Sequence, residues 1–245
     1  MLSATTSNFT RWTVRALLVG LAAWQWRMAP VTSAELRRRV PQCVLGLVCF
    51  GIGISLFFAG DLGTGPWDVF HSGVAKVTGL PVGVVINLVG LAILPLWIPL
   101  KEKIGLGTVL NAILIGMVVD ISKPRFGVSH NLGLRVVCVL AGVLVIGVGS
   151  GLYIGSGLGT GPRDGIMMGL SRMKLSVRTA RTLVEAVTLA LGFVLGGKVG
   201  FGTIAFLVLI GPIVQVAIPR FSLPPLSLPQ SPPLPVPAPP APPAH

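Results

Sequence analysis

The residues with the clearest chemical potential lie in a heptapeptide that occurs twice. Residues 62–68 read Leu-Gly-Thr-Gly-Pro-Trp-Asp, and residues 158–164 read Leu-Gly-Thr-Gly-Pro-Arg-Asp. Glycine ends a helix and proline suits the first turn of the next, so each copy predicts a break followed by a new helix. The N–H groups at such a helix start attract carboxylates and phosphates. The positions that could contact a solute are Gly63, Thr64, Gly65, Asp68, Gly159, Thr160, Gly161 and Asp164.

Each copy of the motif has two interpretations. In the structural one, Asp68 and Asp164 complement the positive end of their own helix and only stabilise its first turn. In the functional one, two broken helices direct their amino ends into a shared polar cavity. Thr64 and Thr160 would then contact solute, and either aspartate could couple its movement to protons or cations.

Two further charges lie inside an apolar run. Glu185 follows Arg181 by four residues, which places both on one face of a helix. A charge at the centre of a bilayer costs about 2.5–3.5 kcal/mol, so both side chains should face protein or water. An Arg181–Glu185 ion pair is one interpretation, and a polar relay for protons or solute is the other.

No catalytic or metal-binding pattern accompanies these residues in the sequence. His71, His130 and His245 are widely separated, and the sequence has no Ser-His, paired-carboxylate or Cys-x-x-Cys arrangement. We therefore expect no enzyme activity, no metal site and no cofactor.

The composition predicts an all-α, polytopic membrane protein. Of 245 residues, 52% are hydrophobic and only 11% are charged, with a mean hydropathy of +0.85. Soluble domains carry about a quarter charged residues, so this chain has too few to cover a surface in water. The net charge of +12 lies in tails and short loops, which indicates membrane topology rather than nucleic-acid binding. Gly147, Gly151 and Gly155, spaced by four, predict a face for close helix packing.

The apolar residues form runs of about 17–25, the length that crosses a bilayer of ~30 Å. We expect six spans, at residues 40–60, 82–100, 104–121, 134–156, 179–197 and 203–218. These divide the chain into a basic cytoplasmic extension that could form an interfacial helix (1–39), a first membrane repeat (40–122), a second membrane repeat (134–219) and a Pro-rich disordered cytoplasmic tail (220–245).

The two repeats are predicted to be inverted. A second signature, Gly-x-Gly-Thr, also occurs twice, at residues 105–108 and 200–203. Three spans in each half would place the two copies in opposite orientations across the membrane. With a cytoplasmic amino terminus, 14 of the 19 Lys and Arg residues face the inside, as the positive-inside bias requires. Both termini are therefore expected in the cytoplasm.

The two signatures also resemble a known family. A glycine-rich span that leads into Gly-Thr-Gly-Pro-Trp-Asp, followed by Gly-Leu-Gly-Thr with Asn111 downstream, is similar to the YczE/YyaS/YitT group of bacterial integral membrane proteins. The resemblance covers roughly residues 38–218. It implies a multi-span protein of the bacterial plasma (inner) membrane. The second repeat departs from the pattern, with Arg163 where the first has Trp67.

For function, the sequence favours a small-solute transporter or permease with its site between the two breaks. The alternative is a membrane accessory or scaffold protein that acts through partner contacts and transports nothing. The expected partners are the lipid bilayer, an unidentified small solute and a second copy of the chain in a homo-oligomer, with no nucleic acid.

Overall fold

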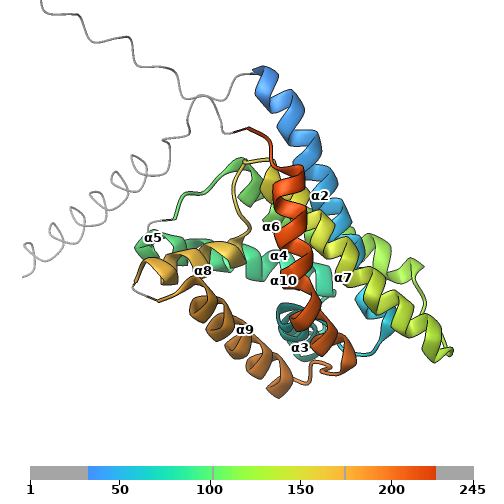
Figure 1. Ribbon diagram of the computed structural model, residues 1–245. Coiled ribbons are helices and arrows are strands. Elements are labelled where there is room, and N and C mark those ends of the chain that lie inside the picture. The colour runs from blue at the N-terminus through green and yellow to red at the C-terminus, as the bar shows by residue number, and fades with distance from the viewer. Residues whose placement is uncertain (1–32, 101, 174, 225–245) are drawn as a thin grey trace, which may run out of the picture.

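The computed structural model describes residues 33–100, 102–173 and 175–224, and all regular structure in these residues is helical (Figure 1). Most of the predicted basic extension and of the Pro-rich tail lies outside the described residues. The elements are α2 (Ser33–Gly60), α3 (Pro66–Thr78), α4 (Val82–Ile93), η1 (Leu94–Leu96), α5 (Trp97–Leu100), α6 (Leu106–Ser122), η2 (Lys123–Arg125), α7 (Leu132–Gly155), α8 (Pro162–Arg172), α9 (Val177–Val194) and α10 (Phe201–Phe221).

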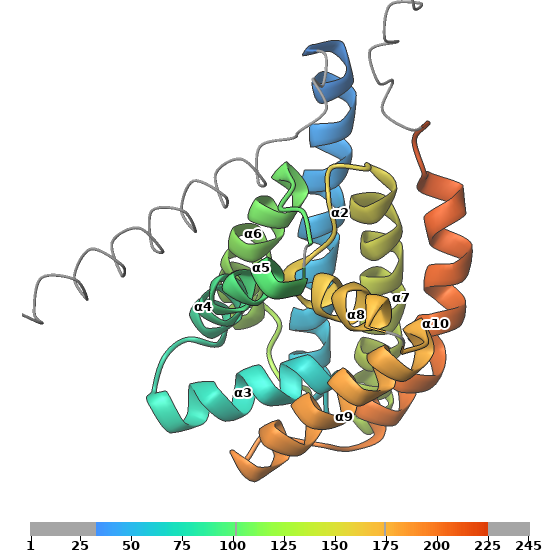
Figure 2. The same ribbon diagram turned by 90° about the vertical axis from the view of Figure 1, so that its left-hand side faces the viewer.

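Five stretches of helix in the described residues are long and apolar enough to cross a membrane. They are Ser33–Gly60, Val82–Leu100, Leu106–Arg125, Leu132–Gly155 and Phe201–Phe221. The remaining predicted span corresponds to α9, which carries Arg178, Arg181 and Glu185 and is not one of the five. The predicted breaks are present, because α3 and α8 each begin at the proline of the motif and lie across the long helices (Figure 2).

Helices α2 and α7 pack along one another on one side of the bundle, at the right in Figure 1. The contact is made by glycines, because Gly46 faces Gly149 and Gly53 faces Gly142. A Cβ on Gly46 or Gly53 would lie only 2.7 or 2.9 Å from the facing carbonyl oxygen. Gly46 and Gly142 occupy equivalent positions in the two repeats, as do Gly53 and Gly149. The same close contact is therefore made twice.

The predicted glycine face on α7 is confirmed. Gly147, Gly151 and Gly155 all pack against α10, where Gly147 meets Ile213 and Gly155 meets the backbone of Phe221. Without side chains in the way, the two helix backbones approach closely and gain van der Waals contact.

Helix α4 packs tightly along α6 in the first repeat. Gly83 and Gly116 face each other so closely that a Cβ on either would overlap the other's carbonyl oxygen. Asn87 Oδ1 accepts a hydrogen bond from Gly116 N at 3.0 Å. The Asp120 carboxylate accepts from Gly83 N at 2.8 Å and from Val84 N at 3.0 Å, which satisfies two N–H groups at the start of α4.

Helix α9, the equivalent of α4, is placed differently. It packs on α3 and α8 and has no comparable interface with α10. Gly211 in α10 is equivalent to Gly116 in α6, yet a Cβ on Gly211 would meet no atom within 4 Å. The helix interface that is closed in the first repeat is therefore open in the second.

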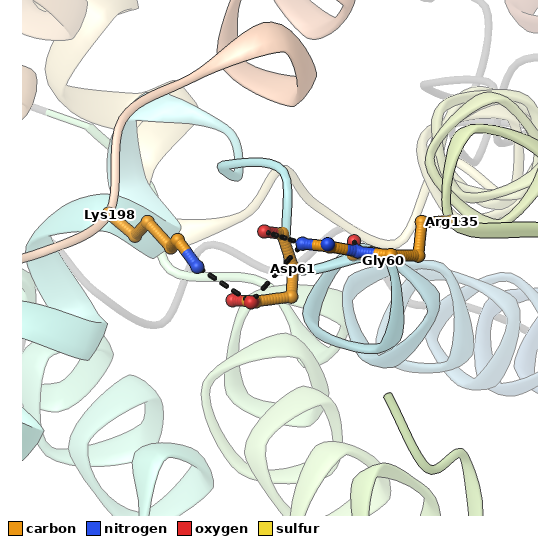
Figure 3. A network of polar contacts seen from close by, with 4 residues as sticks. All are labelled: Gly60, Asp61, Arg135 and Lys198. Atoms are coloured by element: carbon orange, nitrogen blue, oxygen red, sulfur yellow. Dashed lines mark hydrogen bonds and ion pairs between the residues drawn. The ribbon is translucent and has the colours of Figure 1, made fainter. Parts of the chain in front are cut away.

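The end of α2 is tied to the second repeat by a polar network around Asp61 (Figure 3). Arg135 on α7 donates to Gly60 O at 2.8 Å and to Asp61 O at 2.7 Å. Lys198, in the loop before α10, contacts the Asp61 carboxylate at 2.6 Å. These contacts fix the chain at the residue where the first break begins.

The end of α7 is held in the equivalent way. Arg39 has the position in α2 that Arg135 has in α7, and it donates to Ser156 O at 2.8 Å. Arg39 also donates to the carbonyl of Pro224, so the described start of the tail lies against α2 and the end of α7.

Alanine at the two equivalent glycines should distinguish the closed interface from the open one. Gly116→Ala places a methyl group against Gly83 and Asn87, and such overpacking costs about 1–3 kcal/mol. Gly211→Ala adds a methyl group in open space and should leave stability unchanged or slightly raised, because alanine is the better helix former. Thermal unfolding of the purified chain in detergent measures both. Equal losses in the two variants would contradict this assignment.

Candidate functional site: a cavity between two helix breaks

The break of each repeat is held by the Gly-x-Gly-Thr segment of the other. Gly107 N donates to Leu158 O at 2.9 Å, and Gly202 N donates to Leu62 O at 2.8 Å. The two bonds join equivalent atoms of opposite repeats. In hydrocarbon, a carbonyl freed by a helix break costs several kcal/mol unless it finds a partner. Each repeat therefore satisfies a backbone group that the other leaves open.

Glycine makes this crossed contact sterically possible. Gly63 and Gly159 have positive φ values of 95° and 125°, a conformation that other residues rarely adopt. A Cβ on Gly63 would also lie 2.5 Å from Gly200 N. Thr108 Oγ1 adds a bond of 2.7 Å to Thr160 O, which fixes the second break beside α6.

The starts of α3 and α8 converge on one cavity of about 290 Å³. Helices α2, α7, α9 and α10 complete most of its wall. Of the predicted solute-contacting positions, those that line the cavity are Gly65, Asp68, Thr160, Gly161 and Asp164. Three do not line it: Gly63 and Gly159, which form the crossed contact, and Thr64, whose buried Oγ1 has no hydrogen-bond partner in the described part of the chain.

The aspartates of the motif contact side chains rather than capping their helices. Neither α3 nor α8 has a side-chain hydrogen bond at its N-cap. Buried Asp68 lies 3.4 Å from Nδ1 of His71, one turn further along α3. Asp164 accepts a hydrogen bond from the Tyr153 hydroxyl on α7. Both carboxylates remain close enough to a helix start to complement its dipole, while both also face the cavity.

The predicted ion pair on α9 is confirmed. Arg181 Nε lies 2.9 Å from Glu185 Oε1, with the two residues one helical turn apart. Both side chains line the cavity, and their opposite charges neutralise each other there. A role for this pair as a polar relay stays a prediction.

The lining residues that were not assigned to the site from sequence include Phe50, Trp67, Tyr153 and Arg163. The Arg163 guanidinium lies 5.5 Å from the ring centre of Phe50 and 5.7 Å from that of Trp67. The signal for Arg163 and Trp67 was the single difference between the two heptapeptides. Phe50 and Tyr153 lie in apolar runs, where nothing in the sequence separates them from core residues.

A much smaller counterpart of the cavity, of about 10 Å³, lies in the first repeat. Its wall includes Ile86 and Gly90 of α4, which occupy the positions of Arg181 and Glu185 in α9, and Arg163 lines both spaces. The small space lies where α4 packs closely on α6, which leaves little volume between the two helices. The large cavity exists where α9 stands apart from α10.

The groups that line the cavity could bind a solute. The cavity presents hydrogen-bond donors, carboxylates and guanidinium groups within an apolar wall. In the described ranges, no group of three or more His, Cys, Asp or Glu side chains could hold a metal ion.

Comparison with known proteins places the chain among membrane proteins. Residues 37–219 match the model of a family of unknown function, DUF6198. A Haemophilus influenzae protein is 39% identical over 173 residues, covering 70% of this chain and 79% of its own length. Bacillus subtilis YczE, described as an uncharacterized membrane protein, is 33% identical over 180 residues, covering 71% of this chain and 83% of its own length. Bacillus subtilis YyaS is 29% identical over 184 residues, covering 71% of this chain and 90% of its own length. No solved structure matches.

These matches confirm the resemblance to YczE and YyaS that the two signatures indicated. Together with the five long apolar helices, they make the chain an integral, multi-pass membrane protein.

The crossed contact can be tested by steric disruption. Gly105 has an extended backbone that alanine adopts freely, but its Cβ would overlap Leu158 O. Gly105→Ala should therefore destabilise the chain by about 1–3 kcal/mol, because the two repeats must move apart. Gly127→Ala, whose Cβ meets nothing within 4 Å, is the matched control. If thermal unfolding in detergent shows no difference between the two variants, the crossed contact does not hold the breaks together.

Proposed function

We propose that this chain, which belongs to the DUF6198 family of unknown function, is a small-solute transporter whose substrate site is the cavity between the two Gly-Thr-Gly-Pro breaks. The observation that carries the proposal is the pair of unequal spaces, one of about 290 Å³ and one of about 10 Å³, at equivalent places in the two repeats. A transporter with one site must open it to the two sides in turn, and an inverted duplication supplies two equivalent gates.

The inverted repeat is part of this proposal. Equivalent residues make equivalent contacts across the molecule: Gly46 with Gly149 and Gly142 with Gly53, and likewise the two crossed hydrogen bonds. We place the protein in the bacterial plasma (inner) membrane with both termini in the cytoplasm. Relatives in two bacteria and the distribution of Lys and Arg support that setting.

In the proposed cycle, α4 and α9 act as gates and the long helices act as the frame. The present arrangement has α4 closed on α6 through Gly83 and Gly116, and α9 away from Gly211. The opposite state would bring α9 onto α10 at Gly211 and release α4. Exchange of the two arrangements would move the opening of the cavity from one side to the other.

Replacing the cavity aspartates should affect uptake more than folding. Asp68→Asn and Asp164→Asn remove a carboxylate at a helix start, which costs about 0.5–2 kcal/mol, and an intact bundle should survive that loss. If these groups carry a coupling proton or cation, solute accumulation should be lost. Asp164→Asn should be the more destabilising of the two, because Asp164 also holds Tyr153.

The measurement is a solute-uptake screen in proteoliposomes, with expression level and melting temperature recorded for each variant. Asp61→Asn is the control for loss of a carboxylate outside the cavity, and asparagine tolerates its positive φ of 47°. It should lower the melting temperature, because the ion pairs with Arg135 and Lys198 are lost, and still leave uptake intact. Loss of uptake in step with loss of stability would assign the carboxylates a structural role. A folded chain that moves no solute in the screen would favour the accessory or scaffold alternative.

A cross-link between α9 and α10 should stop transport by locking one gate. Thr182 and Gly211 are equivalent to Asn87 and Gly116, which touch in the closed first repeat. A Thr182→Cys, Gly211→Cys pair, made in a chain without Cys43, Cys49 and Cys138, should form a disulfide only when α9 closes. Oxidation should then abolish uptake and reduction should restore it. The single Thr182→Cys variant is the control, and full uptake in the cross-linked chain would exclude this gate.

A further inference from the structure

Arg163 is a cation for which the described part of the chain supplies no anionic partner. Its guanidinium lies near the rings of Phe50 and Trp67 and lines the cavity. Across residues 33–100, 102–173 and 175–224, no carboxylate forms an ion pair with it. Aromatic rings attract a guanidinium, but they do not provide hydrogen-bond acceptors for its five N–H groups. These donors are left to a ligand or to water.

Every other charged side chain of the cavity wall has a side-chain partner. The pairs are Arg181 with Glu185, Asp68 with His71, and Asp164 with Tyr153. An intramembrane charge that no protein group neutralises marks a substrate or ion pathway. His71 and Tyr153 give the two aspartates hydrogen bonds rather than compensating charge. Arg163 differs from them because, among the described residues, its guanidinium has neither a hydrogen bond nor an ion pair, and the best partner for free guanidinium donors is an anion.

A second donor points to the same ligand. Trp67 is 9% exposed and lines the cavity, and its indole Nε1 has no hydrogen-bond partner among the described residues. A buried indole N–H normally finds an acceptor. Trp67 and Arg163 are equivalent positions of the two motifs, each one residue into its helix, so both donors lie where two helix starts also favour an anion.

The rest of the wall restricts the kind of anion. Asp68 and Asp164 line the same space, so a phosphate with two charges would meet two like charges. The remaining wall is largely aromatic and aliphatic, including Phe206 and Ile210. A single negative charge attached to an apolar body suits this combination.

We propose that the solute is a small organic monocarboxylate with an apolar body. Its carboxylate binds Arg163, and its apolar part lies against Phe206 and Ile210. Trp67 Nε1, which is buried beneath the cavity wall in this arrangement, becomes a second donor when the indole turns toward the ligand. This assignment of substrate class rests on the proposed function of the cavity as a solute site. A guanidinium and a carboxylate can form two parallel hydrogen bonds. These bonds orient the bound ligand and add to the attraction between the two charges.

The test compares acids with their neutral amides on the purified full chain in detergent. The probes are benzoate, phenylacetate and isovalerate, their three amides, benzylamine and inorganic phosphate. Dose-dependent thermal stabilisation gives an apparent affinity for each. At least one acid should bind about 10- to 150-fold more tightly than its amide, the range for a hydrogen bond to a charged group. Equal binding of acids and amides, a response to benzylamine or phosphate alone, or no response at all overturns the proposal.

Two variants at Arg163 locate the binding. Arg163→Gln should abolish the difference between acid and amide, and Arg163→Lys should keep part of it, because lysine retains the charge but not the paired geometry. Arg220→Gln removes an exposed charge at the end of α10 and should behave as the unmodified chain does. An acid preference that survives in Arg163→Gln excludes Arg163 as the carboxylate-binding residue.

Uptake of the same labelled acids into proteoliposomes separates the two proposals. Specific binding of an acid without uptake overturns transport and leaves the substrate class intact. Uptake of a neutral or cationic solute, unaffected by Arg163→Gln, overturns the substrate class and leaves transport intact.

Discussion

The architecture depends on two hydrogen bonds between backbone groups of opposite repeats, Gly107 N to Leu158 O and Gly202 N to Leu62 O. A helix that breaks inside hydrocarbon leaves carbonyl groups that no water can satisfy, and each costs several kcal/mol. Neither repeat can satisfy its own break in this way, because the donor lies in the other. The two breaks are therefore held beside one another, and the cavity between them follows from that pairing rather than from any side chain that lines it.

This constraint also determines which parts of the bundle are free to differ. Glycine contacts join α2 to α7. The crossed hydrogen bonds attach α6 to the second break and α10 to the first, so these four helices are connected to one another through backbone contacts. Helices α4 and α9 take no part in the α2–α7 contact or in the two crossed hydrogen bonds. One lies on α6 through Gly83, and the other lies away from Gly211. The two helices therefore differ in their packing while the crossed contacts at the two breaks stay the same.

Local signals in the sequence were sufficient to predict where the helices lie, but they were insufficient to predict which helices contact each other. The apolar runs, the breaks at Pro66 and Pro162, the packing of Gly147 and the Arg181–Glu185 pair all depend on residues close together in the chain, and the structure contains them. The crossed contacts join residues far apart, and glycine carries no side-chain chemistry that would identify its partner. The position of α9 was also not predictable, because its three charges suit either a span or a cavity wall.

The difference between Trp67 and Arg163 has a physical reason once the breaks are known to meet. A strictly symmetric site would place two arginines, or two tryptophans, at the centre of the molecule. Two guanidinium groups there would each carry the insertion cost of about 2.5–3.5 kcal/mol and would repel one another. Two indoles would leave neither helix start with a cation at this position. One of each places the cation 5.7 Å from the ring centre of its own counterpart, and that attraction partly offsets its burial. The two copies of the motif place both positions at helix starts, and their difference at this one position supplies the positive charge.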